Sequence, residues 1–551
     1  MSLRRLPQPG VLLLFGAVLP LLVSAAARSP LAHDAGYYAL QARWMADSGQ
    51  WLAPLWFSQP IFDRCLGAQW LMALSLQLFG GAPWATDLPA LLAGIASLVL
   101  TAWLAQRLLP GSARERRRSA LLAAGLLALT PLWLCYAHLS TQDMPLLAVE
   151  LAGLSALVAS DQPNARWSPL LAGLAPGLAF LIKGFMVALP VLAITPYLLI
   201  ERRWLLRSGR FGLGVMLGAL AVALWLGLSV QTYGLPVVQV LWQKLLFLSK
   251  SDAFSAGPLF YLGVIPATTA PWIAAAVVGS SRLWRSRLPR AGRLVLLLYP
   301  LLLLVLLSSF RTKTTYYALQ LTPWIAITAA VGLQQWSAGR AGTARQVDRV
   351  IAATGGLLLL AALLLAWNGS ALRSALVIRH GASASSWLAA AAAAMGIPWL
   401  LVPAQAGATR RLAALLLGPW LALVLILQSG LFSDTALFDD RRPELRRALA
   451  EPAAQRLLAQ GGLQAAAAEP LSNEEHRQLI RLALATPRSP HQLLPPAAVP
   501  PGQRVWIRRR ELGDPERWQL LLEGRALEDW VLAERLAGSA GRDPSEQPSR
   551  P

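Results

Sequence analysis

Long apolar segments alternate with short polar connections over roughly the first 430 residues of the chain. The hydrocarbon core of a bilayer is about 30 Å thick, and about 20 helical residues cross it. Thirteen segments come close to this length and carry few charges. The predicted spans are residues 11–27, 88–108, 119–137, 144–160, 168–182, 185–200, 211–230, 258–279, 294–308, 315–333, 350–367, 385–402 and 412–428. The pattern therefore predicts an all-α polytopic membrane domain over residues 1–430, with about 13 transmembrane helices.

The arginines between these segments set the predicted orientation, because basic residues collect on the inner side of a membrane. Counted from an N-terminus that lies inside, every dense arginine cluster falls in an inward connection. The clusters lie at residues 114–118, 202–210, 282–293, 340–349 and 410–411. If residues 65–79 crossed the membrane, the arginine cluster at residues 114–118 would fall on the outer side. The segment also contains Gln69 and Gln77, so we predict a helix that lies in the membrane interface. The first span is either a retained signal anchor, which we favour, or a cleavable signal peptide.

Two stretches interrupt the alternation of spans and short connections. The first is an outer loop at residues 28–87, which is long, carries carboxylates and contains an aromatic helix followed by a turn-rich section. The second is residues 431–551, which hold the strand-like runs RVWIR and WQLLLE and a helix-like run LEDWVLAERLA. We expect these residues to form a small soluble α/β domain on the outer face, ending in a disordered tail, GRDPSEQPSRP. A long loop that carries carboxylates on a polytopic protein favours catalysis at the membrane surface.

Composition narrows the classes of function. The chain of 551 residues is 55% hydrophobic and 14% charged, which are too few charges to cover a large soluble protein. Its formal net charge of +21 follows the arginine clusters, so we expect membrane topology to explain it and not nucleic-acid binding. The two cysteines, Cys65 and Cys135, exclude a disulfide framework and a multi-thiolate metal site, and leave a single bridge open.

Cofactor motifs are missing from the sequence. The five histidines contain no pair at the helical spacing of metal ligands, and no glycine-rich nucleotide motif precedes a helix. We therefore expect no cofactor and no ATP or nucleotide-sugar donor, and leave a divalent metal open. The chain also shows no internal repeat, so the inverted-repeat signature of many secondary transporters is missing.

Three carboxylates lie at the predicted outer ends of helices. Asp34 precedes an aromatic helix that begins with Tyr37, a candidate substrate contact, and Asp34 is suited to deprotonate an acceptor hydroxyl. Its alternative role is that of a helix N-cap. Asp143 lies in the outward turn AHLSTQDMP, where an ionisable residue suggests function, although capping of the following helix is an equal alternative. Asp63 precedes Arg64, which it would orient.

Four cations share the predicted outer face with these carboxylates. Arg64 and Lys183, the latter in the tight turn FLIKGF, would bind a phosphate together with Arg311 and Lys313 of SSFRTKTTYY. Each cation alone is also explained as an interface anchor, and Asp63–Arg64 as a charged turn at the membrane surface. All four cations lie on the predicted outer face, whereas basic residues usually collect on the inner face of a membrane. This placement favours a phosphate site in the outer leaflet.

The order of these motifs resembles the polyprenyl-phosphate-sugar-dependent GT-C glycosyltransferases, among them the family 39 protein O-mannosyltransferases and the lipid A aminoarabinose transferases. HDAGYYALQARWMADSGQWLAP is similar to their first-loop motif, and PIFDRCLGAQWLMALSLQLFG to their Phe-Glu-Lys-Pro-Pro segment with the helix that follows. STQDMPL, FLIKGF and SSFRTKTTYYALQLTP are similar to their Thr-x-Asp-Met-Pro, Thr-Lys-Gly and Ser-x-Ser-Lys-x-x-x-Tyr segments. Five motifs in the family's order make the resemblance specific.

The resemblance implies a GT-C fold and an inverting transfer, in which an acceptor hydroxyl attacks C1 of a sugar on a polyprenyl phosphate at the outer face. The catalytic acid residue of the relatives falls at the position of His33, which leaves Asp34 as the only carboxylate of the pair. We expect Asp34 to be the base or the residue that orients the acceptor, the cations to bind the phosphate, and Asp63 and Asp143 to organise the site. This chain departs from the family at several positions: His33 replaces the first aspartate of the pair and becomes a candidate to share the catalytic work, Arg64 replaces a lysine, and Cys65-Leu66 replaces two prolines. The loop at residues 231–257 has Trp242-Gln243-Lys244 in place of the Glu-His pattern.

The sequence thus predicts a multi-pass glycosyltransferase of the bacterial inner membrane, with its site and its C-terminal domain on the periplasmic face. Its expected partners are a polyprenyl-phosphate-linked sugar, membrane lipids, and a hydroxyl or phosphate acceptor on lipid A, protein or glycan. A lipid or sugar flippase is the rival reading, although nearly all charges here sit at the ends of spans and do not line a path through the bilayer. A catalytically degenerate GT-C relative is the other alternative, because of His33.

Overall fold

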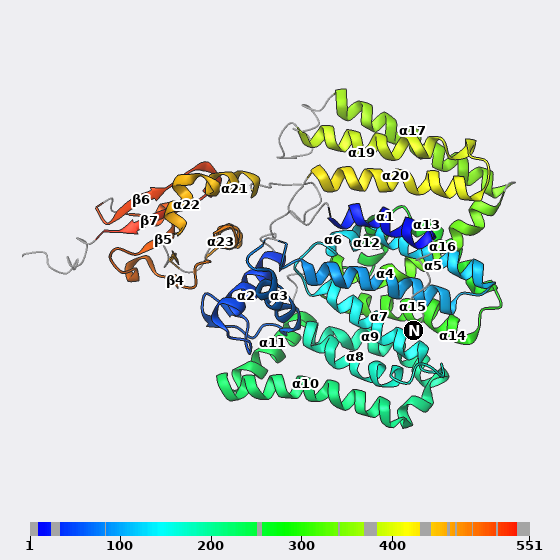
Figure 1. The fold of residues 1–551 in the computed structure, drawn as a ribbon, viewed down its shortest axis with the longest axis horizontal. Helices are drawn as coiled ribbons and strands as arrows, with labels where there is room; N and C mark the ends of the chain where they lie inside the picture. Colours follow the sequence, from blue (N-terminus) through cyan, green and yellow to red (C-terminus); the bar gives the residue numbers. More distant parts are fainter. Residues whose placement is uncertain are drawn as a thin grey trace, which may run out of the picture. The chain divides into compact units, whose positions relative to one another are not determined.

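The computed structural model describes residues 9–23, 34–82, 84–250, 256–339, 342–367, 383–429, 442–459, 463–468, 471–486, 489–513 and 516–536. The chain divides into two compact units, whose elements are labelled in Figure 1. Unit 1 comprises residues 1–27, 62–68 and 87–439, and unit 2 comprises residues 28–61, 69–86 and 440–551. Most of the first outer loop therefore belongs to the same unit as the C-terminal residues. A functional division at residues 430 and 431 stays a prediction.

The secondary structure elements of unit 1 are helices in the part of the chain that the structure describes. Its helices are α1 (Pro9–Val23), α4 (Leu88–Leu108), α5 (Ala113–Ala128), α6 (Pro131–Tyr136), α7 (Asp143–Ala159), α8 (Ser168–Lys183), α9 (Ala188–Glu201), α10 (Gly209–Tyr233), α11 (Pro236–Lys250), α12 (Phe260–Thr269), α13 (Ile273–Arg285), α14 (Arg290–Arg293), α15 (Tyr299–Ser309), α16 (Thr322–Ala338), α17 (Thr343–Trp367), α19 (Ser383–Leu400) and α20 (Ala408–Ser429). Short 3-10 turns join several of them: η1 (Gly184–Val187), η2 (Arg203–Arg207), η4 (Thr315–Leu321) and η5 (Val402–Ala404). A π-helical turn, η3 (Leu294–Leu298), precedes α15.

Helices occur at all thirteen predicted spans, but they differ in length and continuity. Among the described residues, seven helices are long and apolar enough to cross a bilayer unaided, and α12 with α13 is an eighth candidate, bent by 107°. The seven include α8 with α9 as one segment of 34 residues, which the sequence divides into two spans at Lys183. Shorter helices such as α6 and α7 fill the remaining predicted positions. The polytopic helical architecture is confirmed, whereas the number thirteen stays a prediction.

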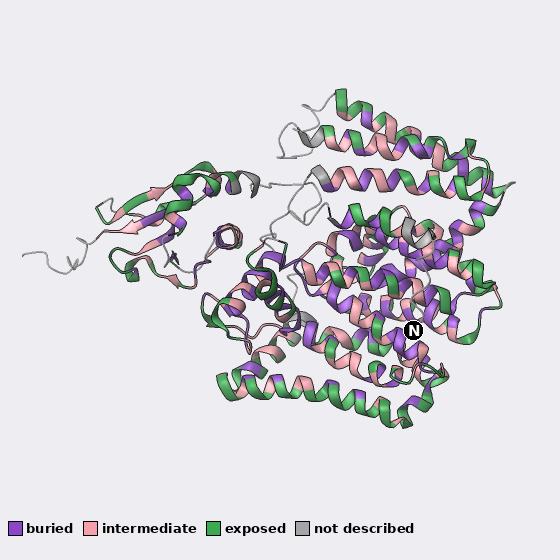
Figure 2. Ribbon diagram, in the orientation of Figure 1, coloured by how far each residue is buried: buried purple, intermediate pink, exposed green. Residues whose placement is uncertain are grey.

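Close helix contacts in unit 1 depend on glycine. Helices α8 and α10 approach so closely that a Cβ atom on Gly214 would lie 2.1 Å from the carbonyl oxygen of Leu170. The pairs Gly173 with Gly177 and Gly214 with Gly218 have the spacing of small residues at packed membrane helices. Apolar surface faces outward on such helices, and Figure 2 shows α10 and α17 with many exposed residues, whereas α7 and α16 are mostly buried. This distribution suits a bundle whose outer face contacts lipid.

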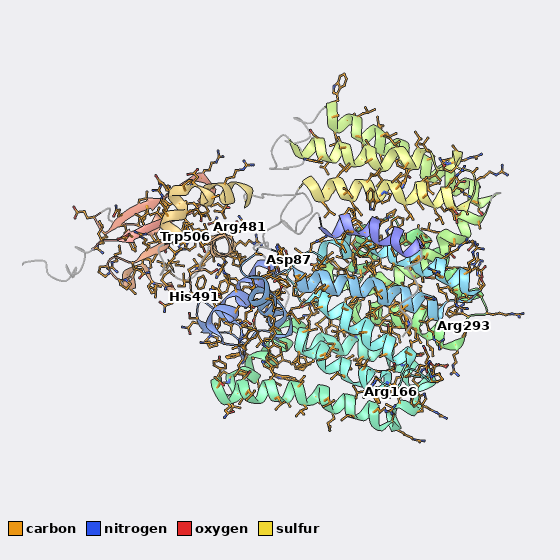
Figure 3. All side chains as sticks on the ribbon, in the orientation of Figure 1. Asp87, Arg166, Arg293, Arg481, His491 and Trp506 are labelled. Atoms are coloured by element: carbon orange, nitrogen blue, oxygen red, sulfur yellow. The ribbon has the colours of Figure 1, made fainter. Side chains whose placement is uncertain are left out.

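The polar ends of unit 1 differ in charge. Asp87 lies at the start of α4, at one end of the bundle, whereas Arg166 and Arg293 lie at the opposite end (Figure 3). The second end carries the arginines of the connections that the positive-inside rule assigns to the inner face. This distribution within unit 1 fits the predicted orientation.

Unit 2 combines helices with a mixed five-stranded sheet. It contains α2 (Asp34–Ser48), most of α3 (Gly67–Phe79), α21 (Arg442–Ala450), α22 (Pro452–Ala459), α23 (Asn473–Ala485) and the short hairpin β1 (Leu55–Trp56) and β2 (Gln59–Pro60). The sheet has the strand order β4-β3-β5-β7-β6. Its strands are β3 (Gln464–Ala466), β4 (Leu493–Leu494), β5 (Arg504–Arg508), β6 (Trp518–Leu522) and β7 (Trp530–Arg535), and 3-10 turns connect them at η6 (Pro496–Ala498), η7 (Arg509–Glu511) and η8 (Arg525–Leu527). The predicted strands RVWIR and WQLLLE are confirmed as β5 and β6.

The predicted helix in LEDWVLAERLA is wrong. Residues Trp530–Arg535 form β7, which pairs antiparallel with both β5 and β6 and is thus an inner strand of the sheet. Four consecutive residues, Trp530 to Ala533, are buried, so the run is apolar on both faces and shows no alternation that would mark it as a strand. Such short apolar runs cannot be distinguished from a helix by periodicity alone, and strand pairing decided the outcome.

The first outer loop shares its core with the C-terminal residues inside unit 2. Leu40 and Trp44 of α2 and Phe57 after β1 pack in one apolar cluster with residues of α21, α22, α23 and β5. The indole Nε1 of Trp44 donates to the carbonyl oxygen of Pro490 at 3.1 Å, and Ser58 Oγ donates to that of His491 at 2.6 Å. Helix α3 exposes Leu71, Leu74 and Leu78, spaced along one helical face, as an interfacial helix would.

Candidate functional site

The centre of the candidate site in unit 1 is an ion pair between Lys183 and Asp143. Lys183 is the last residue of α8, and Gly184 turns the chain with a φ of 61°, a conformation that glycine adopts without strain. Asp143 is the first residue of α7. The Nζ atom of Lys183 donates to Oδ1 of Asp143, and both side chains are only 12% exposed. The structure thus joins two residues that the sequence placed in separate outward turns.

Aromatic rings from η4 surround the Lys183 ammonium. Its Nζ atom lies 4.6 Å from the ring centroid of Tyr316 and 5.4 Å from that of Tyr317, within the range of cation–π attraction. The two tyrosine rings meet edge to face at 4.9 Å, and Tyr136 lies 5.9 Å from Tyr316. The rings stabilise the positive charge of the partly buried Lys183 ammonium, and they carry no net charge themselves. An anion with acceptor oxygens fits such a place.

The segment at residues 62–68 is anchored beside this pair. Gln142, which precedes Asp143, donates from Nε2 to the carbonyl oxygen of Cys65 at 3.0 Å. A Cβ atom on Gly67 would lie 2.8 Å from the carbonyl oxygen of Leu181, and one on Gly184 would lie 3.3 Å from Cys65 Sγ. A side chain at residue 67 would clash with the backbone of α8, and the positive φ at residue 184 favours glycine there, so both glycines let the loop segment lie against the end of α8.

Cys65 itself is inert in this environment. Burial raises the pKa of its thiol to about 12, so the thiol stays protonated at neutral pH and is a poor nucleophile. Cys65 and Cys135 are not joined by a disulfide. The single bridge that the sequence left open is therefore not formed.

Arg64 and Asp63 form a charged pair within this anchored segment. The Nε and Nη2 atoms of Arg64 lie 2.9 Å and 2.8 Å from Oδ2 of Asp63, and the side chains are 20% and 26% exposed. Within the described part of the chain, the buried Oδ1 of Asp63 has no hydrogen-bond partner. Phe62 packs at 5.4 Å on Tyr233 at the end of α10, which fixes the segment from the other side. Asp63 thus contacts Arg64, and the predicted role of this pair in phosphate binding stays a prediction.

Lys313 has a different environment from Lys183. It is 7% exposed and donates from Nζ to the carbonyl oxygens of Ala256, at 3.1 Å, and of Phe310. These contacts fix the backbone between α15 and η4. Arg311, two residues earlier, is exposed. The predicted phosphate-binding roles of Arg311 and Lys313 stay predictions.

The remaining predicted site residues belong to unit 2. Asp34 is exposed and is the first residue of α2, in the first turn and not before the helix as an N-cap would be. Tyr37 is half-buried and packs at 5.0 Å on Trp56, which also faces His476 at 5.8 Å. His33 lies outside the described residues. The catalytic roles of Asp34 and His33 and the substrate contact of Tyr37 stay predictions.

Sequence reasoning missed two polar pairs near the outer ends of the helices in unit 1. Gln320 of η4 donates from Nε2 to Oε1 of Glu150 on α7 at 2.9 Å, and Ser140 Oγ donates to Oδ1 of the buried Asp87. Glu150 could have been noticed in the sequence, because it is an acidic residue inside an otherwise apolar segment. No sequence signal pointed to its partner, because the position of η4 depends on the fold.

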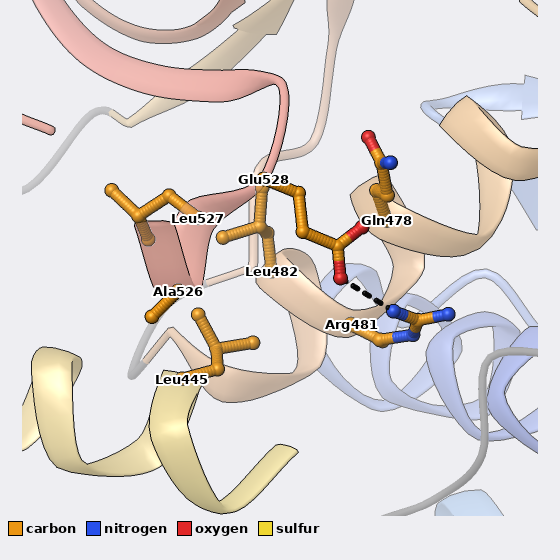
Figure 4. Close-up of a pocket in the computed structure, with 7 residues that line it drawn as sticks. All are labelled: Leu445, Gln478, Arg481, Leu482, Ala526, Leu527 and Glu528. Atoms are coloured by element: carbon orange, nitrogen blue, oxygen red, sulfur yellow. Dashed lines mark hydrogen bonds and ion pairs between the residues drawn. The ribbon is translucent and has the colours of Figure 1, made fainter. Parts of the chain in front are cut away.

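The described residues contain other polar clusters besides this site. Among the described residues, no group of three His, Cys, Asp or Glu side chains could hold a metal ion. Dependence on a divalent metal stays open. Figure 4 shows a pocket in unit 2 that Arg481 and Glu528 share with leucine side chains. Arg481 and Glu528 are ion-paired at 2.7 Å, and the pocket lining includes none of the site residues predicted from the sequence, so we do not take it as the site.

Comparisons with known proteins agree with this picture. The sequence profile of the dolichyl-phosphate-mannose-protein mannosyltransferase family matches residues 63–227. An undecaprenyl phosphate-α-4-amino-4-deoxy-L-arabinose arabinosyl transferase from Edwardsiella ictaluri is 28% identical over 342 residues, which cover 60% of each chain. The Pseudomonas aeruginosa enzyme of the same name is 30% identical over 296 residues, 52% of each chain. The match thus spans less than two thirds of either relative.

Solved structures extend the likeness to nearly the whole chain. ArnT from Cupriavidus metallidurans bound to undecaprenyl phosphate superposes with a TM-score of 0.74 over 98% of this chain and 100% of that one, at 20% identity. Its apo form gives 0.70 over 97% and 99%, at 18% identity.

The fold and the sequence matches define a multi-pass membrane protein with the GT-C fold, as the sequence motifs indicated. More particularly, the chain is related to the undecaprenyl phosphate-α-4-amino-4-deoxy-L-arabinose arabinosyl transferases.

Proposed function

We propose that this protein is a polyprenyl-phosphate-sugar-dependent glycosyltransferase that moves 4-amino-4-deoxy-L-arabinose from undecaprenyl phosphate to lipid A. The observation that carries the proposal is the Lys183 ammonium, held by Asp143 and faced by Tyr316 and Tyr317 beside the anchored Asp63–Arg64 segment. We infer the donor from the name of the related arabinosyl transferases. We infer lipid A as the acceptor from the family resemblance. We place the reaction at the periplasmic face of the bacterial inner membrane, because the arginine clusters assign the other face to the inside.

The proposed chemistry is a single displacement with inversion at the sugar. The acceptor oxygen forms a bond to C1, the bond from C1 to the phosphate oxygen breaks, and undecaprenyl phosphate leaves with the bonding electrons. Negative charge on the leaving phosphate then grows, and cations that are already in place stabilise it without reorganisation. Lys183 is such a cation because its partner and the tyrosine rings fix it before substrate binds. Arg64 would add a planar donor group, held by Asp63.

The acceptor proton needs a base, for which we propose Asp34. This carboxylate is exposed at the start of α2, and His33 next to it would share the role. We further propose Asp143 and Asp63 as organisers of the cations, Tyr37 as a substrate contact, and Arg311 and Lys313 as additional phosphate binders.

The test is transfer by the purified full-length protein in proteoliposomes. The vesicles contain lipid A and undecaprenyl phosphate-α-4-amino-4-deoxy-L-arabinose, and mass spectrometry follows both lipids. We expect lipid A to gain the aminoarabinose mass while undecaprenyl phosphate accumulates in equal amount. If the donor moves to the opposite leaflet with no modified lipid A, the protein is a flippase, and the proposal fails. If a protein or glycan is modified in its place, the acceptor is wrong and the enzyme class stands.

A further inference from the structure

Glu150 is an acid two helical turns inside α7, a membrane-spanning segment by prediction. Asp143 and Glu150 are the two charged residues of this helix, and seven residues separate them, so they share one face. An ionisable side chain at such a depth is costly and is retained where it has a functional partner.

That partner is Gln320, which comes from η4. Its Nε2 atom donates to Oε1 of Glu150 at 2.9 Å, and the residue is 7% exposed. Its own Oε1 atom is buried and has no hydrogen-bond partner among the described residues. Among the described residues, the hydrogen bond to Glu150 is therefore the side-chain contact that holds this amide in place.

The geometry of η4 links this contact to the proposed site. In a 3-10 helix, side chains three residues apart lie one above the other, so Gln320 stands on the same face as Tyr317. Such helices have weaker backbone hydrogen bonds than α-helices, and side-chain anchors decide where they lie. The start of η4 is anchored where Tyr261 donates from its hydroxyl to the carbonyl oxygen of Thr314 at 3.3 Å. Glu150 anchors its far end.

We propose that Glu150 and Gln320 are positioning residues, which hold η4 so that Tyr316 and Tyr317 enclose Lys183 in the geometry that accepts the donor phosphate. The binding of a donor phosphate at Lys183 rests on the proposed function. Neither Glu150 nor Gln320 needs to touch the donor. They keep the ring centroids of Tyr316 and Tyr317 at 4.6 Å and 5.4 Å from the Lys183 Nζ atom.

The test compares Glu150→Leu, Glu150→Gln and Gln320→Leu in the full-length protein. Two readouts are needed: transfer kinetics with undecaprenyl phosphate-α-4-amino-4-deoxy-L-arabinose and lipid A, and binding of undecaprenyl phosphate alone. We expect Glu150→Leu and Gln320→Leu each to raise the donor KM and the Kd of undecaprenyl phosphate by about tenfold, the scale of one buried hydrogen bond. The KM for lipid A should stay unchanged. Glu150→Gln keeps the acceptor oxygen and should stay within about threefold of wild type.

The matched control is Gln334→Leu on the same chain. Gln334, near the other end of α16, accepts a hydrogen bond from Ser119 of α5 at 3.0 Å, so this change also removes a polar contact between helices. It should lower the yield of folded protein at most and leave both KM values unchanged. Loss of fold alone lowers the active fraction and not the affinity for donor. Gln320→Leu breaks the contact from the side of η4 and carries the test where Glu150→Leu gives no folded protein.

Several outcomes overturn the inference. It fails if the leucine variants keep the wild-type Kd for undecaprenyl phosphate, if Glu150→Gln is as impaired as Glu150→Leu, or if Gln334→Leu weakens binding equally. If binding of undecaprenyl phosphate depends on this pair but the wild-type protein transfers no sugar, the proposed function is overturned and the positioning role stands. A wild-type protein that does not bind it overturns both.

Discussion

Lys183 combines an ion pair with Asp143 and two aromatic contacts in a partly buried turn. Because a preorganised cation acts on the leaving phosphate, we expect Lys183→Gln to lower transfer by about 10²–10³-fold, the usual effect of losing one such group. Lys183→Arg keeps the charge but not the compact shape and should recover part of the activity. Rates of aminoarabinose transfer in proteoliposomes measure both. Arg114→Gln, at an exposed arginine of α5, is the control and should transfer at the wild-type rate.

Asp34 allows a separate test of the proposed base. Asn keeps the size of the side chain but cannot accept a proton, so Asp34→Asn should lower transfer by about 10²–10⁴-fold. Binding of undecaprenyl phosphate should not change, because the base acts on the acceptor. The matched control is Asp47→Asn, which alters an exposed carboxylate in the last turn of the same helix. Wild-type rates for Asp34→Asn would remove Asp34 from the mechanism.

How far the sequence predicts a residue's role depends on where its partner comes from. Asp143 and Lys183 could be singled out because each charge marks the end of an apolar segment, and orientation alone put both on one face. Their pairing with each other needed the fold. The Glu150–Gln320 contact was beyond reach, since 170 residues separate the two positions and η4 has no periodic signal. Lys313 shows a similar limit, because no sequence signal indicated that its ammonium donates to backbone carbonyl groups.

Among the elements, α23 begins with a carboxylate that should make unit 2 sensitive to acid. Burial would raise the pKa of Glu475, but hydrogen bonds from the Ser472 backbone and from Arg508 outweigh it and lower the pKa to about 2 from 4.5. A group whose pKa is lower in the folded state stabilises that state above its unfolded pKa. The contribution is therefore present above pH 4.5 and is lost as the pH falls toward 2.

We expect Glu475→Gln to destabilise α23 by roughly 2 kcal/mol at pH 7, somewhat less than the full pKa difference implies. The difference from wild type should shrink steadily below pH 4.5. Hydrogen exchange of the α23 amides, compared between variant and wild type at each pH, measures this. Glu474→Gln alters the neighbouring carboxylate, which is 54% exposed, and should have little effect. A difference that stays constant down to pH 3 would contradict the assigned cause.

Element prediction succeeded where the local pattern was long and failed where it was short. Helix α4 coincides with a predicted span because its 21 residues carry one continuous apolar signal. The run that became β7 was too short to show its period, and pairing with β5 and β6 overrode its apparent helical pattern. Broken helices such as α12 and α13 are likewise invisible in hydropathy, which records apolar length and not direction.

For the whole molecule, the least predictable feature is that the first outer loop and the C-terminal residues fold as one unit. Trp44 and Pro490 are joined across a sequence separation of 446 residues. The hydrophobic pattern of a sequence cannot reveal such a contact. It indicates which face of an element is buried, but it does not identify the element that packs against that face. The consequence is that the helix carrying Asp34 depends on the distant C-terminal residues for its core.

A chain ending at residue 429 tests this dependence. Leu40, Trp44 and Phe57 would lose the apolar partners of α21 to α23 and the sheet, and each large side chain is stabilised by roughly 1.5–3 kcal/mol when buried. We therefore expect the amides of residues 34–61 to lose their protection from hydrogen exchange and sugar transfer to cease, while α4 and α16 in unit 1 stay protected. A chain ending at residue 536 keeps every described residue and should behave as wild type. Full protection of residues 34–61 in the shorter chain would show that the loop folds by itself, and the C-terminal residues would then need another role.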